Sequence, residues 1–140
     1  MKSVLKEFYA VVKKWDIDID SIEWEKLIED INVFAKKFEK DAFLYEFACR
    51  VSCKELADSL QFCKDKEKRL GNVDVIFQLL YGLIGIAPKA KDFDSWEAAC
   101  AVARGIAKLS DFGFRIAMAT LDFLEKKSLN EYDKEVKGAA

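Results

Sequence analysis

The chain has 140 residues, of which 51% are hydrophobic and 34% charged, and its 23 basic and 25 acidic residues give a net charge of −2. This composition is typical of one folded domain and excludes a disordered chain. The near-neutral balance makes nucleic acid unlikely as the only partner. The sequence contains no histidine, so the commonest general acid–base group and the commonest metal ligand are both missing.

Apolar residues at helical spacing predict a first helix from Ser3 to Trp15. The acidic loop 16–20 follows, and Asp20 with Glu23 predicts a capping box that opens a second helix. We expect the first helix to bury Leu5, Phe8, Val12 and Trp15, and the second to bury Trp24, Leu27, Ile28, Ile31, Ala35 and Phe38.

A long third helix is predicted from Asp41 to Arg69, with Gly71 as the residue that ends it. Steps of four and three residues indicate a core seam along this helix. The seam consists of Cys49, Cys53, Leu56, Leu60 and Cys63.

Residues 73–87 are almost entirely apolar, interrupted only by Asp74 and Gln78. The stretch is shorter than the about 20 residues that span a bilayer, so we expect no membrane insertion. A helix that is apolar on all sides must be covered on all sides. We therefore expect 73–87 to be the buried central helix, with Leu79 in the core and Gly82 and Gly85 allowing another helix to approach.

The last helix is predicted to begin at a second capping box, Asp94 to Glu97, and to continue to about residue 128. Its polar face keeps one register through Gly113, so we expect a continuous helix with at most a kink there, and close approach of another helix at this glycine. The single helical domain then covers 1–128, and 129–140 form a polar, frayed tail. The predicted fold is all-α, a compact to slightly elongated bundle of about five helices around the central apolar helix 73–87.

Three short motifs have a simpler structural explanation than a functional one. Cys49 and Cys53 have a spacing seen in zinc sites, but no second pair accompanies them, so the cysteines of the seam are expected to pack in the core. The acidic loop 16–20 resembles the start of a calcium loop but lacks the glycine and the final glutamate. Residues 111–113 match a kinase magnesium triplet with none of the other kinase motifs. We predict no catalytic residues, no metal site and no cofactor.

The last helix carries a basic stripe with one acidic residue within it, formed by Arg104, Lys108, Asp111 and Arg115. Arginine is favoured at protein interfaces, although a helix face of mixed sign is usually just solvated. This stripe is the only interaction site that the sequence suggests.

We expect a non-enzymatic protein–protein interaction module, of the inhibitor, immunity or anti-defence accessory type, with another protein as its partner. The alternatives are a small helical subunit of a larger assembly, including one that handles nucleic acid, and a helical bundle that binds a hydrophobic ligand. A homo-oligomer is compatible with each of these three functions. Four cysteines without a secretion signal or a glycosylation sequon favour the cytoplasm.

Overall fold

The computed structural model describes residues 1–65, 69–90 and 92–139. These residues form helices and loops without a β-strand, so the all-α fold is confirmed. A π-helical stretch, Ala48–Cys53, joins two of the helices, and short 3-10 turns lie at Ile19–Ser21 and Ala87–Lys89. The α-helices are α1 (Lys2–Trp15), α2 (Trp24–Lys36), α3 (Ala42–Phe47), α4 (Lys54–Asp65), α5 (Val73–Ile86), α6 (Phe93–Ala107) and α7 (Asp111–Ala139).

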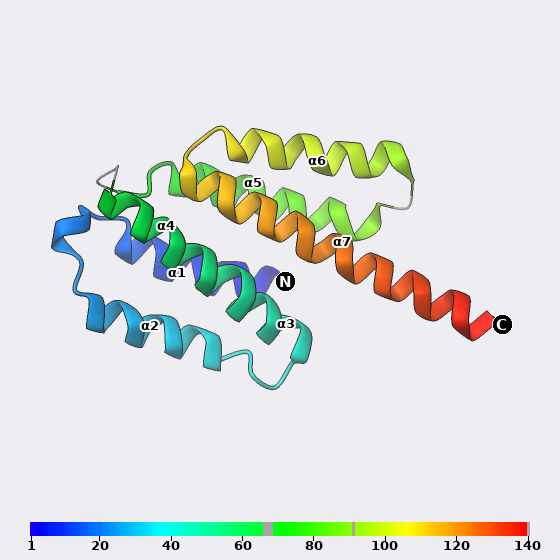
Figure 1. Cartoon of the computed structure of the whole chain (residues 1–140), viewed down its shortest axis with the longest axis horizontal. Coiled ribbons are helices and arrows are strands. Elements are labelled where there is room, and N and C mark those ends of the chain that lie inside the picture. Colours follow the sequence, from blue (N-terminus) through cyan, green and yellow to red (C-terminus); the bar gives the residue numbers. More distant parts are fainter. Residues whose placement is uncertain (66–68, 91, 140) are drawn as a thin grey trace.

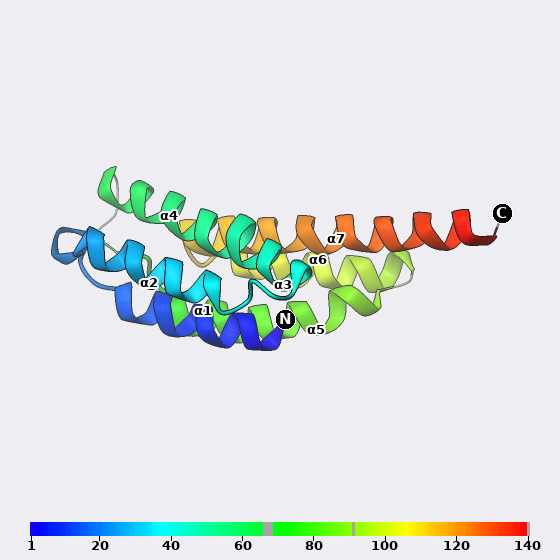
Figure 2. The same cartoon turned by 90° about the horizontal axis from the view of Figure 1, so that it is seen from below.

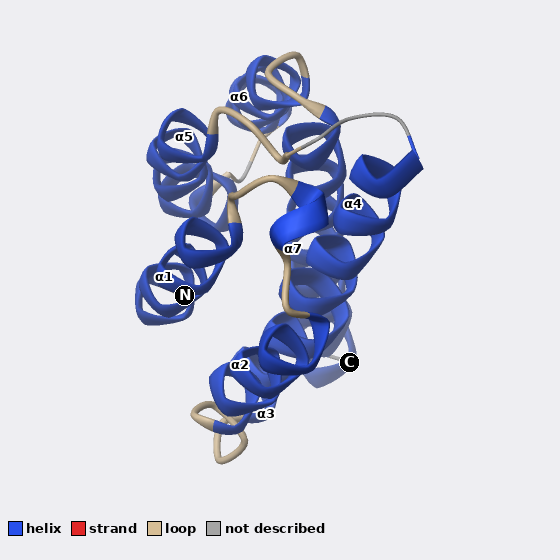
Figure 3. Ribbon diagram, turned by 90° about the vertical axis from the view of Figure 1, so that its left-hand side faces the viewer, coloured by secondary structure: helices blue, strands red, loops and turns tan. Residues whose placement is uncertain are grey.

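Helix α7 packs between two groups of helices (Figure 1). It packs on α6 and α5 on one side, and on α4 and the π-helical stretch on the other. Viewed along the bundle, α1 and α5 lie on the opposite side from α4 (Figure 3). The C-terminal part of α7 extends past the other helices (Figure 2).

The core forms where α1, α5 and α7 meet. The predicted stripe of α1 is confirmed, because all four of its residues are buried. The Phe8 ring lies 5.5 Å from Phe77 and 6.4 Å from Phe112, measured between ring centroids. Such edge contacts between buried rings add specificity to the burial of their area.

The expectation that residues 73–87 are covered on every side is wrong. One face of α5 packs on α1, α6 and α7, and this face buries Ile76, Phe77 and Leu80 among others. The opposite face is open, and Val75, Leu79 and Ile86 are 44%, 36% and 39% exposed. The packed face is entirely apolar, whereas the exposed face also carries Asp74 and Gln78, so the two interruptions of the apolar stretch mark its open side.

The third predicted helix contains the π-helical stretch, which changes which residues face the core. Cys63 is buried as predicted, but Cys49 and Cys53 are only half-buried. A π-helix accommodates one residue more than the α-helical pitch, and each residue corresponds to about 100° of rotation. The buried face therefore shifts to Phe47, just before the stretch, and to Val51 within it.

The predicted last helix is two helices, α6 and α7, which fold back on each other after Ala107. The expected single helix from residue 94 to about 128 is therefore wrong: the break lies at 108–110, whereas α7 itself runs through Gly113. The expected close approach at Gly113 is confirmed: a Cβ there would lie 2.5 Å from the carbonyl oxygen of Ile106, at the end of α6. The backbone of α7 is helical through Ala139, and the division into a domain 1–128 and a frayed tail stays a prediction.

Neither predicted capping box forms. Helix α2 begins at Trp24 without a side-chain cap, and the Asp18 carboxylate accepts the backbone N–H of Asp20 at 3.0 Å instead. Helix α6 is capped by Asp92, which accepts the backbone N–H of Ser95 at 2.8 Å. The predicted buried face of α2 is correct at Leu27, but its Trp24 and Ile28 are 41% and 56% exposed.

Three buried hydroxyl groups, on Ser52, Ser59 and Thr120, have no hydrogen-bond partner within the described part of the chain. A buried polar group without a partner costs about 1–3 kcal/mol. We expect Ser59→Ala to raise the free energy of unfolding by about 0.5–1.5 kcal/mol, because it removes this cost and improves helix propensity.

The matched control for this prediction is Ser110→Ala. The Ser110 hydroxyl accepts the backbone N–H of Gly113 at 3.0 Å at the start of α7, so its loss should lower the free energy of unfolding by about 1 kcal/mol. Urea denaturation of both variants measures the two changes. Destabilisation by Ser59→Ala would mean that its hydroxyl has a partner in solution.

Candidate interaction groove

A groove of about 550 Å³ runs between α7 and the segment formed by the π-helical stretch and α4. We call it the α4–α7 groove. Its floor consists of Val51, Met118, Ala119 and Phe123, and Phe114 stands at its edge. The π-helical stretch contributes to this site because its shifted register turns Val51 toward α7; π-helical turns occur frequently at functional sites.

Two aromatic rings pack on Phe123, which lines the groove. The Phe123 ring lies 5.3 Å from both Phe43 and Phe47, between centroids. The ammonium group of Lys127 lies 5.2 Å from the centroid of Phe43 and 3.6 Å from the carboxylate of Glu46. At the edge, Phe114 is 54% exposed, so a large apolar side chain is available for contact with a partner.

The rim of the groove carries charges of both signs. Each basic side chain of the rim has a carboxylate of this chain within 4 Å: Arg50 pairs with Glu46 at 3.3 Å, Lys54 with Asp58 at 3.2 Å, Arg115 with Asp111 at 2.7 Å and Lys126 with Asp122 at 3.0 Å. The rim is therefore electrostatically balanced and does not present a field of one sign.

Arg115 is the most confined of these cations. Its side chain is one-third exposed, and its guanidinium carbon lies 5.9 Å from the ring centroid of Phe62. The hydrogen bond to Asp111 raises the pKa of Arg115. The Arg115 side chain thus extends from α7 and places its positive charge beside Phe62 of α4.

The structure divides the predicted basic stripe between two helices. Arg104 lies on α6, where it is exposed and pairs with Glu97 at 2.9 Å. Lys108 is exposed just after the end of α6. Asp111 and Arg115 are half-buried on α7, and Arg115 lines the groove. The helix break between Ala107 and Asp111 therefore separates Arg104 from the groove.

A second hollow, of about 350 Å³, is lined by Tyr45, Cys49 and Cys53 together with residues of α2. Burial, and then the neighbouring Cys49, raises the pKa of Cys53 to about 12. Its thiol is therefore protonated at neutral pH, which disfavours nucleophilic attack by this residue because the thiolate is the nucleophile. Within the described residues, no three His, Cys, Asp or Glu side chains form a group that could hold a metal ion.

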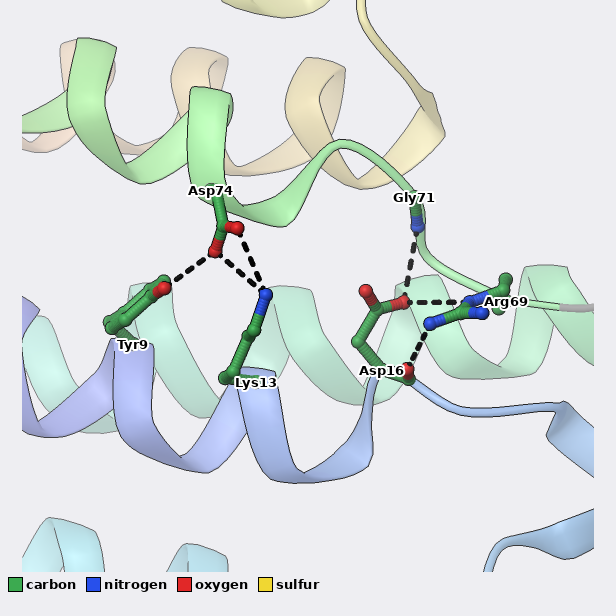
Figure 4. A network of polar contacts seen from close by, with 6 residues as sticks. All are labelled: Tyr9, Lys13, Asp16, Arg69, Gly71 and Asp74. Carbon is green, nitrogen blue, oxygen red and sulfur yellow. Dashed lines mark hydrogen bonds and ion pairs between the residues drawn. The ribbon is translucent and has the colours of Figure 1, made fainter.

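A polar network connects α1 to the start of α5 (Figure 4). The Asp74 carboxylate accepts the Tyr9 hydroxyl at 2.5 Å and the Lys13 ammonium at 2.9 Å. The hydrogen bond from Tyr9, followed by that from Lys13, lowers the pKa of Asp74 below 3.8. All three side chains are at the surface, so the network orients two helices and encloses no site.

The second half of this network fixes the turn before α5 (Figure 4). Arg69 donates to the Asp16 backbone carbonyl at 2.6 Å, and the Gly71 N–H donates to the Asp16 carboxylate at 3.3 Å. Gly71 has a φ of 79°, a conformation that favours glycine, and Asn72 follows with a φ of 55°. Gly71 therefore does not end the third predicted helix: α4 ends at Asp65, Arg69 is not helical, and Gly71 forms a left-handed turn that leads into α5.

The lowered pKa of Asp74 predicts an acid-sensitive contribution to stability. A carboxylate whose pKa is lower in the folded protein stabilises it above the unfolded-state pKa of about 3.8, and this stabilisation is lost as the pH falls through the folded-state value. We expect Asp74→Asn to be less stable than the original protein at pH 6, and this difference to disappear once the pH falls below the folded-state pKa of Asp74. Urea denaturation at several pH values measures it. A difference that is constant with pH would contradict the ionic role of Asp74.

Sequence reasoning missed the residues that build the groove, namely Val51, Phe114 and Met118. The available signal was the large apolar Phe114 beside the polar face of the last predicted helix. In the continuous helix that we expected, however, no other helix was predicted to pack next to Phe114.

None of the helices described is both long and apolar enough to cross a membrane. No protein-family model, curated protein or solved structure matches the chain.

Proposed function

We propose that this protein is a non-enzymatic protein–protein interaction module whose α4–α7 groove binds an amphipathic helix of a partner protein in the cytoplasm. The observation that carries this proposal is the combination of an apolar floor, an exposed aromatic edge at Phe114 and a rim of paired charges. A groove between two helices accepts a third helix whose apolar side chains recur every three or four residues.

The rim favours a protein over nucleic acid. A phosphate backbone is recognised by unpaired cations in a positive field, and its binding weakens steeply with salt. In the α4–α7 groove each cation already has its own carboxylate within 4 Å. A partner helix with both acidic and basic side chains beside its apolar stripe can exchange ion pairs with this rim, so we expect a shallow dependence of binding on salt.

Site-specific photo-crosslinking tests the groove directly. A benzophenone amino acid placed at position 114 should crosslink one partner protein in cells, through a segment of that partner with an amphipathic helical pattern. The same probe at position 93 is the control, because Phe93 is 79% exposed but lies at the start of α6, outside the groove. A partner that crosslinks equally from both positions, or from neither, would overturn the proposal.

Substitution then links the groove to affinity for the partner so identified. We expect Phe114→Glu to reduce the affinity at least tenfold without loss of helical circular dichroism, because it places a charge where an apolar contact forms. Phe93→Glu should leave the affinity unchanged. Equal binding by both variants would show that the crosslink at 114 reports proximity alone.

A further inference from the structure

A pair of cysteines lines the hollow of about 350 Å³ between α2 and the π-helical stretch, which we call the α2 hollow. Tyr45, Cys49 and Cys53 follow one another at steps of four residues. A π-helix has i→i+5 hydrogen bonds, so two residues that are four apart in it lie nearly one turn apart, on the same face. Both cysteines are half-buried, so a small ligand in the hollow can contact both side chains from one side.

We propose that Cys49 and Cys53 form a two-coordinate site for the soft monovalent cation Cu(I), held between their two sulfur atoms. Thiolate ligands select Cu(I), zinc and iron–sulfur clusters. Zinc takes three or four protein ligands and an iron–sulfur cluster takes four, whereas Cu(I) is stable between two sulfur atoms. Within the described residues no three His, Cys, Asp or Glu side chains form a group that could hold a metal ion. The number of donors in the α2 hollow therefore favours Cu(I).

Binding of Cu(I) releases the protons of the two thiols. In the free protein, burial and then the neighbouring Cys49 raise the pKa of Cys53 to about 12, so this sulfur carries its proton at neutral pH. A coordinating cation displaces such a proton to the solvent. One Cu(I) and two thiols therefore give a bis-thiolate complex with one net negative charge and two released protons, and neither the copper nor the sulfur atoms change their oxidation state.

Polar groups of the α2 hollow stabilise this negative charge. A hydrogen bond with the Cys49 side chain raises the pKa of Tyr45, so the Tyr45 hydroxyl keeps its proton and donates it toward the sulfur. Hydrogen bonds to the ligands of a metal tune its affinity. Lys36 of α2 also lines the hollow and supplies a positive charge, which Glu39 in the same wall partly offsets.

Anaerobic titration of the full chain with Cu(I), in competition with the chromophoric chelator bicinchoninate, tests the site. We expect one Cu(I) to bind per chain. Cys49→Ser and Cys53→Ser should each weaken binding by about a hundredfold or more, because loss of a group that merely supports a ligand already costs about 10–100-fold. Cys100→Ser is the matched control, since Cys100 is also half-buried but lies on α6, and its affinity should be unchanged. No binding by the original protein, or binding that survives either of the first two substitutions, would overturn the proposal.

X-ray absorption at the copper edge tests the coordination without any substitution. We expect two sulfur neighbours in a near-linear arrangement, in a complex of one chain with one copper by native mass spectrometry. Three sulfur neighbours, or one copper shared between two chains, would contradict the two-coordinate site. Tight binding of zinc that needs both cysteines would contradict the choice of Cu(I). Because the α2 hollow and the α4–α7 groove are lined by different residues, either proposal can fail while the other holds.

Discussion

Leu80→Asp is expected to leave the protein largely unfolded. Leu80 lies on the packed face of α5 and is completely buried. Removing a buried leucine costs about 2–5 kcal/mol, and an unpaired carboxylate in its place adds several more. Small domains have a free energy of unfolding of about 5–15 kcal/mol, so the expected loss equals most or all of this stability. Far-ultraviolet circular dichroism and urea denaturation measure the loss.

The neighbouring residue provides the matched control. Leu79 is 36% exposed on the opposite face of α5, so an aspartate there can remain hydrated. We expect Leu79→Asp to stay folded and to lose no more than about 1 kcal/mol. A folded Leu80→Asp protein together with an unfolded Leu79→Asp protein would mean that the register of α5 is rotated by one residue.

This pair also shows what the sequence could and could not predict. Periodicity identified α1 and its buried stripe, because polar residues separate its apolar positions. In α5 the buried residues also follow helical spacing, and the two polar residues Asp74 and Gln78 both lie on the exposed face. The open face was therefore indicated, but Val75, Leu79 and Ile86 on that face made the stretch almost continuously apolar, so full coverage by α1, α6 and α7 was expected. The sequence therefore predicted the helix correctly and its environment incorrectly.

The groove could not be predicted for a related reason. Its floor depends on the π-helical stretch, which rotates Val51 toward α7, and an α-helical register assigns the core to Cys49 and Cys53 instead. Its edge depends on the break between α6 and α7. The polar face predicted for one continuous helix remained in register across residues 108–110 by coincidence, so Arg104 and Arg115 were placed on one stripe that the fold separates.

Gly113→Ala is expected to lower the free energy of unfolding by about 1–3 kcal/mol, the range for an overpacked core position. The new Cβ would lie 2.5 Å from the carbonyl oxygen of Ile106 and 3.3 Å from the Cδ1 atom of Ile76. The Ile106 oxygen belongs to the backbone, so it cannot move aside by a change of rotamer. The connection between α6 and α7 must shift as a whole, and this shift disturbs the packing of both helices on α5.

Gly105→Ala separates this steric effect from helix propensity. Gly105 lies inside α6, and a Cβ there would meet nothing within 4 Å. Alanine should therefore stabilise the protein by about 0.5–1 kcal/mol, the ordinary gain over glycine in a helix. Relative to the original protein, the melting temperature and the free energy of unfolding in urea should both fall for Gly113→Ala and both rise for Gly105→Ala. If both alanines are stabilising, α6 and α7 do not approach at Gly113, and the continuous helix that the polar face predicts becomes the better description of residues 93–128. The close approach of α7 to the end of α6 therefore depends on glycine at position 113, because any side chain there displaces the connection between the two helices.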